Sequence, residues 1–195
     1  MLAKQAASRR AHGAPNRVRI IGGQYRRRLL EFPDRDGLRP TPDRVRETLF
    51  NWLGQDLPGW HCLDLFAGSG ALGFEAASRG AARVALVERD AAASQALEKN
   101  RQALGTSAIE IVRADALAWL AGNRTAWNLI FLDPPFDSGL AASILPELSG
   151  HLAPGGLVYV EQGAEVTVPA GFIMLKSGRA GRSHFALLEK EDVSC

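Results

Sequence analysis

Four carboxylates stand directly after, or at the end of, apolar segments that have the composition of buried β-strands. They are Asp64, Glu88, Asp115 and Asp133. An ionised carboxylate accepts hydrogen bonds from hydroxyl and amino groups and attracts cations. Because the ligands of an open parallel sheet bind beyond the carboxyl ends of its strands, we expect the four side chains to lie around one binding site.

A glycine-rich loop follows the first of these carboxylates, in the stretch LDLFAGSGALG at 63–73. Gly68, Gly70 and Gly73 have the GxGxxG spacing of a dinucleotide-binding loop, although a tight strand-to-helix turn without a ligand also fits. Asp64 favours another ligand, because a carboxylate repels a pyrophosphate but suits an ammonium and a sulfonium group. S-adenosylmethionine carries both cations and no phosphate. Glu88 does not distinguish between the two cofactors, since it can bind the ribose of NAD or of S-adenosylmethionine.

The second stretch that predicts chemistry is LDPPFD at 132–137. The Asp133 carboxylate and the Pro134 carbonyl can accept both hydrogens of an exocyclic amino group, which directs its nitrogen lone pair towards an electrophile. Phe136 offers a flat face on which a base can stack. The alternative is a rigid connection in which Asp133 is a local cap. Asp115 likewise can cap a helix that begins at Ala116, with or without a contact to adenine.

Strands and helices alternate from residue 61 onwards. The expected strands are 61–66, 83–88, 109–114, 128–133 and 156–161, and the expected helices are 71–80, 91–105, 116–122 and 138–152. Near-continuous apolar strands separated by helices predict a parallel sheet that is covered on both faces. Two final runs, FIMLKS and SHFALLEK, flank a short turn and predict an antiparallel hairpin at the edge of the sheet.

The N-terminal part is basic and precedes the alternating pattern. Through Arg46 there are twelve Lys and Arg against four Asp and Glu, whereas the remainder has eleven against seventeen. VRIIGGQYRRRLLEF predicts a small β-hairpin whose charge indicates a nucleic-acid partner, although a basic arm can also serve solubility alone. In the next segment Thr41 is expected to cap a helix, with Pro42 at its first position and Gly54 at its end.

Several classes of protein are excluded by composition. No apolar run approaches the roughly 20 residues of a membrane span, so we expect no membrane association. Cys62 and Cys195 have no metal-ligand spacing and the four His are scattered, so we expect no metal and a reducing cytoplasm. Residues 1–16 contain no acid, and we interpret them as a disordered basic tail rather than an organelle transit peptide.

The ordered series DLFAGSGALG, LVERD, RADA and DPPF resembles the Rossmann-type methyltransferases that modify exocyclic amino groups of bases. The RPTPDRVRETLFNWL block and the IIGGQYRRRLL arm narrow this resemblance to the bacterial 16S rRNA guanine-N2 methyltransferases, over about residues 17–190. The resemblance implies an α/β, Rossmann-like S-adenosylmethionine-dependent methyltransferase fold. Its expected parts are a seven-stranded, mostly parallel sheet, an antiparallel C-terminal hairpin and a small N-terminal β-hairpin arm.

Carried over by position, the resemblance implies roles for individual residues. The amino-group site is expected at Asp133, Pro134, Pro135 and Phe136. The cofactor loop and strand ends are expected to bind S-adenosylmethionine through Asp64, Phe66, Ala67, Gly68, Gly70, Glu88, Arg89, Asp115 and Ala116. Thr41, Arg44 and Glu47 are placed near its methionyl end, although a helix cap with surface charge is an equal alternative. Pro42 replaces the second Thr of the usual RPTTD, so a hydroxyl contact of that residue would be missing here.

We therefore expect a monomeric enzyme that methylates the N2 amino group of a guanine in 16S rRNA, free or in the small ribosomal subunit. The arginines expected to hold RNA phosphates are Arg17, Arg19, Arg26, Arg27 and Arg28. The expected divisions are the tail at 1–16, an RNA-binding arm at 17–40 and a catalytic domain at 41–190. Alternatives are a DNA amino-methyltransferase, an NAD-dependent oxidoreductase and a non-enzymatic RNA-binding module.

Overall fold

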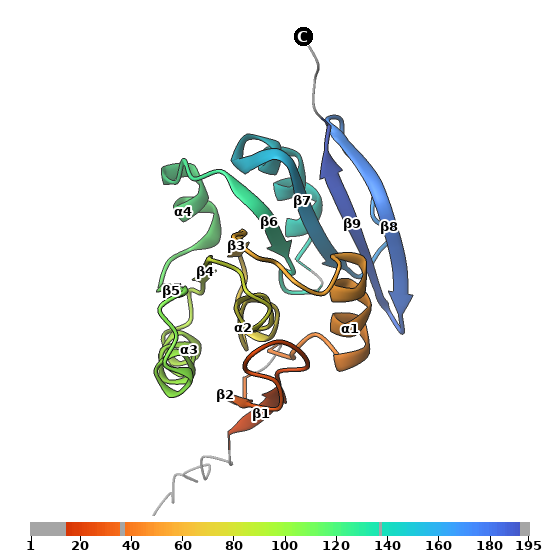
Figure 1. The fold of residues 1–195 in the computed structure, drawn as a ribbon. Helices are drawn as coiled ribbons and strands as arrows, with labels where there is room; N and C mark the ends of the chain where they lie inside the picture. Colours follow the sequence, from red (N-terminus) through yellow and green to blue (C-terminus); the bar gives the residue numbers. More distant parts are fainter. Residues whose placement is uncertain (1–14, 36–37, 137, 192–195) are drawn as a thin grey trace, which may run out of the picture.

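A twisted seven-stranded sheet forms the centre of the molecule, with helices on both of its faces (Figure 1). The computed structural model describes residues 15–35, 38–136 and 138–191. The strands of the sheet are β3 (His61–Asp64), β4 (Arg83–Val87), β5 (Ile109–Val112), β6 (Trp127–Leu132), β7 (Leu152–Gln162), β8 (Phe172–Ala180) and β9 (Ser183–Lys190). The helices are α1 (Asp43–Trp52), α2 (Ala71–Ser78), α3 (Ala91–Leu104), α4 (Ala116–Gly122), α5 (Leu140–Ile144) and the 3₁₀ helix η1 (Leu145–His151).

The order of the strands is β5-β4-β3-β6-β7-β9-β8. Strands β3 to β7 are parallel to one another, whereas β9 is antiparallel to both β7 and β8. The expected mostly parallel sheet with an antiparallel C-terminal hairpin is therefore confirmed. The hairpin does more than close the edge, because its second strand lies between β7 and β8. The order reverses at β3, and ligands of such sheets bind beyond the strand ends at this point.

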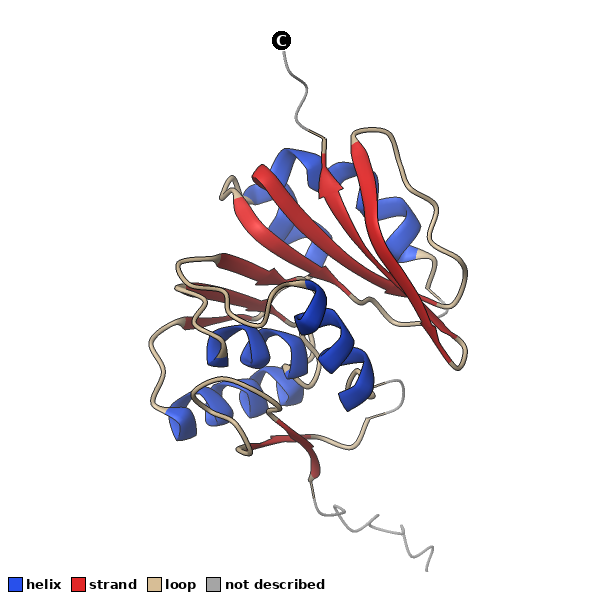
Figure 2. Ribbon diagram, turned by 45° about the vertical axis from the view of Figure 1, so that its right-hand side comes forward, coloured by secondary structure: helices blue, strands red, loops and turns tan. Residues whose placement is uncertain are grey.

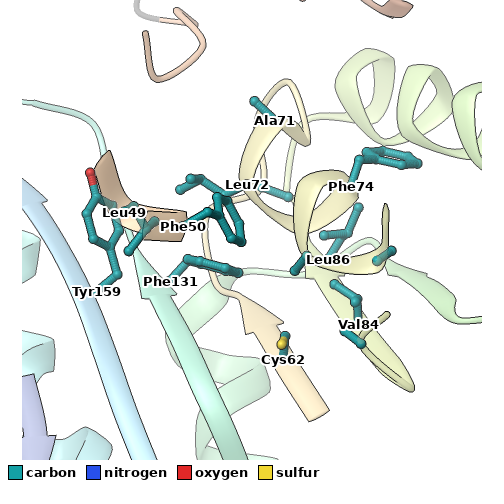
Figure 3. Close-up of a cluster of buried hydrophobic side chains, with 14 of the residues drawn as sticks. Leu49, Phe50, Cys62, Ala71, Leu72, Phe74, Val84, Leu86, Phe131 and Tyr159 are labelled. Atoms are coloured by element: carbon teal, nitrogen blue, oxygen red, sulfur yellow. The ribbon is translucent and has the colours of Figure 1, made fainter. Parts of the chain in front are cut away.

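Helices lie on both faces of the sheet (Figure 2), and a separate apolar cluster fills the space on each face. On one face, α1 and α2 pack against the strands through side chains such as Phe50, Leu72 and Phe131 (Figure 3). On the other face, α4, α5 and η1 cover Ile130 and Val160. Burial of both faces explains why the central strands read as continuous apolar runs rather than as an alternating pattern.

Two helices differ from the sequence-based expectation. The segment 138–152 is not one helix, because α5 ends at Ile144 and η1 follows it. Pro146 has no N–H to donate to an earlier carbonyl, so the α-helical pattern stops there. Helix α1 begins at Asp43 with Pro42 at the N-cap, and the Pro42 residue has no side-chain cap bond. The prediction that Thr41 caps this helix is therefore wrong.

The small N-terminal sheet consists of β1 (Asn16–Arg19) and β2 (Leu29–Phe32), which are antiparallel. It lies beside α2 and α3 (Figure 1). The turn between its strands approaches α2 so closely that Cβ atoms on Gly22 and Gly23 would lie 2.4 Å from the Arg79 Nη2 and 1.9 Å from the Ser78 carbonyl oxygen. The Gly-Gly step thus permits the arm to dock. The tail expected at 1–16 falls almost wholly outside the described residues, and Asn16 belongs to β1.

A buried ionic network fastens this arm to the sheet domain. Glu75 of α2 is fully buried and accepts hydrogen bonds from the backbone N–H of Ile21 at 2.8 Å and of Gly22 at 2.7 Å. Its carboxylate also pairs with Arg79 at 2.9 Å and with Arg46 of α1 at 3.3 Å. Every acceptor direction of Glu75 is thereby used, which is the condition under which a buried charge is tolerated.

None of the helices within the described ranges is both long enough and apolar enough to span a membrane.

Candidate functional site

The glycine-rich loop between β3 and α2 is held in a tight turn at the point where the strand order reverses. Gly68 and Gly70 have φ angles of +51° and +78°, in the left-handed region that favours glycine. Gly73 serves a different purpose, because a Cβ there would lie 2.1 Å from the Leu86 Cδ2. It allows α2 to pack directly on β4. The three glycines therefore shape the turn and bring the helix close to the sheet.

Asp64 lies beneath this loop and is only 2% exposed. Its Oδ2 accepts a hydrogen bond from the Gly73 N–H at 3.1 Å, so the carboxylate also anchors the first turn of α2. Burial raises the pKa of Asp64 to about 7, the Gly73 bond opposes that rise, and the nearby Glu88 charge adds to it. A cation bound beside this carboxyl would favour its ionised form.

Glu88 closes the loop from the end of β4. Its Oε2 accepts from the Gly68 N–H at 2.9 Å and its Oε1 from the Asp90 N–H at 2.7 Å. Two carboxylates, Asp64 and Glu88, thus converge on the glycine turn. This set of acceptors would repel a diphosphate, whereas it fits ribose hydroxyls and a cationic group. The chemistry of the loop therefore fits S-adenosylmethionine better than NAD.

The loop after β6 carries the second half of the site. The Thr41 hydroxyl donates a hydrogen bond to Oδ2 of Asp133 at 3.0 Å, across 92 positions of the sequence. Thr41 is buried immediately before α1, and its own carbonyl accepts from Nε of Arg46 at 3.1 Å. Thr41 is thus a hydrogen-bond donor to the Asp133 carboxylate rather than a helix cap. The alternative in which Asp133 is only a local cap has no hydrogen bond to support it among the described residues.

Asp133 shares its surroundings with a second buried carboxylate, Glu161, at the end of the neighbouring strand β7. Burial raises the pKa of Asp133 well above its usual value, and the Glu161 charge adds to this effect, whereas the Thr41 bond opposes it. The Tyr159 hydroxyl donates to Oε2 of Glu161 at 2.7 Å, and the Ser183 hydroxyl donates to Oε1 at 2.5 Å. Burial also raises the pKa of Tyr159, so its phenol stays protonated as a donor.

A pocket of about 390 Å³ opens beside this loop. Its walls include Pro134 and Phe136 from the loop, Glu161 from β7 and Arg182 from the turn between β8 and β9. The Phe136 ring is 39% exposed, and the Arg182 guanidinium lies 6.0 Å from its centre. Gly163 keeps room next to this ring, because a Cβ there would lie 3.0 Å from the Phe136 Cε1. The pocket therefore joins an aromatic face to hydrogen-bonding groups.

The remaining residues expected at the cofactor site differ in burial and in their hydrogen bonds. Phe66 is half-buried, and the buried Ala67 donates its N–H to the Val87 carbonyl at 2.9 Å, within the glycine loop. Asp115 caps α4 by accepting from the N–H groups of Leu117 and Ala118, both at 3.1 Å. Arg44, Glu47 and Arg89 are exposed, and Ala116 is buried.

The arginines expected to bind RNA lie on the arm, in two settings. Arg17 pairs with Glu31 at 2.7 Å and Arg19 with Asp43 at 3.4 Å, so both have partners within the protein. Arg26, Arg27 and Arg28 lie exposed in the turn between β1 and β2. This turn therefore presents charge to solvent, as the paired but exposed Arg17 and Arg19 also do.

Sequence reasoning missed Arg46, Glu75 and Glu161. The spacing of Glu75 and Arg79, four apart on a helix, is a signal for an ion pair, but nothing in the sequence distinguishes the buried Arg46 from the exposed Arg44. Glu161 had a clear signal. It is the next-to-last residue of β7, the fifth parallel strand, just as Asp64, Glu88 and Asp133 end or follow theirs.

The comparisons with known proteins agree with this geometry. A family model described as "Conserved hypothetical protein 95" matches residues 18–189. "Ribosomal RNA small subunit methyltransferase D" of Escherichia coli is 46% identical over 185 residues, which cover 92% of this chain and 93% of that protein. The protein of the same name from Haemophilus influenzae is 40% identical and covers 90% and 95% of the two chains.

Solved structures show the same architecture. A structure from Escherichia coli has a TM-score of 0.82 at 46% identity and covers 90% of this chain and 99% of its own. A structure from Haemophilus influenzae has a TM-score of 0.77 at 37% identity, with 91% and 100% covered. An S-adenosylmethionine-dependent methyltransferase fold from Streptococcus mutans has a TM-score of 0.68 at 15% identity, with 83% and 52% covered. The expected methyltransferase fold is confirmed.

Proposed function

The chain belongs to the family of its relatives named ribosomal RNA small subunit methyltransferase D, and we propose that it transfers a methyl group from S-adenosylmethionine to the N2 amino group of a guanine in small-subunit 16S rRNA. The observation that carries this proposal is the Asp133 carboxylate held by Thr41 beside Pro134, one strand away from the glycine loop. The names of the relatives support rRNA of the small subunit as substrate. The choice of guanine N2 rests on the sequence resemblance and on the acceptors in the pocket.

The cofactor is assigned to the acidic glycine loop. Gly68 and Gly70 let the backbone approach it closely, Glu88 accepts from its ribose, and Asp64 favours its cationic end. Bound S-adenosylmethionine supplies an electrophilic methyl group on sulfur, and its transfer to nitrogen leaves S-adenosylhomocysteine. The other residues proposed for this pocket are Thr41, Arg44, Glu47, Phe66, Ala67, Arg89, Asp115 and Ala116.

The loop at 133–136 is assigned the role of binding the reacting amino group of the base. Asp133 and the Pro134 carbonyl accept its two hydrogens, so the nitrogen lone pair points away from both acceptors. Phe136 stacks on the base. Holding the nitrogen in line with its methyl donor is the main contribution to rate. The nitrogen must lose one proton when its new bond to carbon forms, and the ionised Asp133 is placed to receive it.

The N-terminal arm is assigned the role of binding the RNA. Residues 17–40 form this RNA-binding part and residues 41–190 the catalytic domain in the proposed division. Arg26, Arg27 and Arg28 meet phosphates, with Arg17 and Arg19 at the base of the arm. The target amino group must reach Asp133 and the Pro134 carbonyl, so the target guanine is unpaired or flipped out of its helix.

Transfer of labelled methyl groups to small-subunit RNA tests the proposal. The wild-type protein is expected to label this RNA, and Asp133→Asn is expected to label it at least about 100-fold more slowly. Cofactor binding, measured by calorimetry, should stay within about threefold in this variant because Asp133 contacts the base. No labelling by the wild-type protein of free RNA or of assembled particles would refute the proposal.

A further inference from the structure

Glu161 has no role in the transfer described above, yet it lines the same pocket as Pro134 and Phe136. It is a carboxylate at the end of β7 and is only 6% exposed. A buried charge is costly unless it is hydrogen-bonded. The hydrogen-bond partners of this carboxylate therefore decide whether it can also bind a ligand in the pocket.

Two hydroxyl groups hold Glu161 in position. Tyr159 donates to Oε2 at 2.7 Å and Ser183 donates to Oε1 at 2.5 Å. Tyr159 belongs to the same strand, and Ser183 begins β9, so two adjacent strands fix the carboxylate. An ionised carboxylate offers about four acceptor sites. About two of them therefore remain for a ligand in the pocket.

The register of the sheet brings Glu161 next to Asp133. Leu132 of β6 pairs with Val160 of β7, and Asp133 and Glu161 are the next residues of these two parallel strands. The effect of the Glu161 charge on the pKa of Asp133 agrees with this proximity. The site thus presents two neighbouring acceptors, one beside the other, at the carboxyl end of the sheet.

Two neighbouring acceptors fit one of the three bases that carry an exocyclic amino group. In guanine, the N2 amino group stands beside N1–H, which is a donor. In adenine and cytosine, the amino group stands beside an unprotonated ring nitrogen, which is an acceptor and would face the Glu161 carboxylate without a hydrogen. A site built to bind a donor rejects an analogue that lacks it, because its own buried polar group is left unpaired.

We infer that Glu161 accepts the N1–H of the target guanine while Asp133 and the Pro134 carbonyl bind its N2 amino group, so that Glu161 selects guanine over adenine and cytosine. This inference rests on the proposed function. It assigns Glu161 as a specificity residue that touches the substrate, and Tyr159 and Ser183 as the residues that position it.

The test compares two RNA oligonucleotides that span the guanine mapped by digestion of labelled rRNA. One has guanine at that position, and the other has 2-aminopurine, which keeps the N2 amino group but has no N1–H. The wild-type protein is expected to show a kcat/KM at least about 10-fold higher for guanine, as for a lost hydrogen bond to a charged group. Equal rates for the two oligonucleotides would overturn the inference without any variant.

Glu161→Gln should lower the preference for guanine over 2-aminopurine by at least about 10-fold, because the amide can present an N–H to the bare N1. Glu165→Gln, the same change at an exposed position four residues further on, should keep the wild-type preference. Retention of the full preference by Glu161→Gln would overturn the role of Glu161 and leave the proposed function intact. Failure of the wild-type protein to methylate guanine N2 would overturn both.

Discussion

The Thr41 hydroxyl donates to Oδ2 of Asp133 at 3.0 Å, which joins the segment before α1 to the loop after β6. The carbonyl of Thr41 accepts from Arg46, and Arg46 pairs with Glu75, which also binds the backbone of the arm. The proposed amino-group site and the proposed RNA-binding arm therefore share one continuous set of hydrogen bonds through α1. This connection holds the basic arm and α1 (Asp43–Trp52) against the loop after β6.

Replacing Thr41 with Val should slow methyl transfer and shift its pH dependence. The hydroxyl bond lowers the pKa of Asp133, so its loss raises that pKa and moves the acidic limb of the kcat profile to higher pH. We expect kcat at neutral pH to fall about 10-fold or more, as for a lost hydrogen bond to a charged group. Thr41→Ser, which keeps the hydroxyl, should restore the profile. An unshifted acidic limb in Thr41→Val would argue against the role of Thr41.

Asp64→Asn should change how stability depends on pH. Because burial raises the pKa of Asp64 from about 3.8 to about 7, the folded state binds a proton that the unfolded state has lost between these values. Ionisation of Asp64 therefore destabilises the fold as pH rises from 4 to 8, by on the order of 4 kcal/mol. The variant should lose this decline, while its amide oxygen can still accept from the Gly73 N–H.

Denaturant unfolding of the cofactor-free protein at pH 4.5, 6 and 8 measures this effect. Asp56→Asn, at an exposed position, is the matched control and should follow the wild-type curve. Equal pH dependence of wild type and Asp64→Asn would contradict the raised pKa.

Glu75→Gln should destabilise the protein strongly, because it removes the buried anion that Arg46 and Arg79 share, and Arg46 keeps only its pair with the half-exposed Asp43. A loss of about 3–5 kcal/mol in the free energy of unfolding is expected when one partner of a buried pair is removed. The same substitution at Glu110, whose pair with Arg83 is exposed, should cost less than about 1 kcal/mol. Similar losses in the two variants would show that the buried network does not fasten the arm.

Joint replacement of Arg26 and Arg27 with Gln should weaken RNA binding without affecting the cofactor. Loss of two phosphate contacts lowers the slope of log K against log salt by about 1.4 for single-stranded RNA. The matched control replaces Arg83, the first residue of β4, and Arg124, which lies three residues before β6. A salt slope equal to that of the wild type would remove the turn of the arm from the RNA interface. Deletion through residue 28 is a poorer test, because Ile20 is fully buried in the core.

Much of the fold follows from the sequence. Apolar strands and intervening helices predict the parallel sheet, and the short GRAGR turn predicts the β8–β9 hairpin. The position of β9 between β7 and β8 is not encoded locally, because it depends on long-range pairing. Pro146 signals the break between α5 and η1, whereas the hydrogen bond from Thr41 to Asp133 joins residues 92 positions apart and has no local signal in the sequence.

The candidate site follows from the sequence where strand ends carry it, but not where it depends on packing. The rule for strand ends selects Asp64, Glu88 and Asp133 as candidates, and the same rule applied to β7 selects Glu161. The choice between Arg44 and Arg46 could not be made, because both lie in one helical turn and only the docked arm determines which is buried.

Identification of the methylated nucleoside tests the central claim most directly. Small-subunit RNA is incubated with the protein and methyl-labelled S-adenosylmethionine, digested to nucleosides and separated, with Asp133→Asn as the inactive control. The account predicts that the label is recovered as N2-methylguanosine and is absent from the control. Label on adenosine, on cytidine or on another atom of guanosine would contradict it.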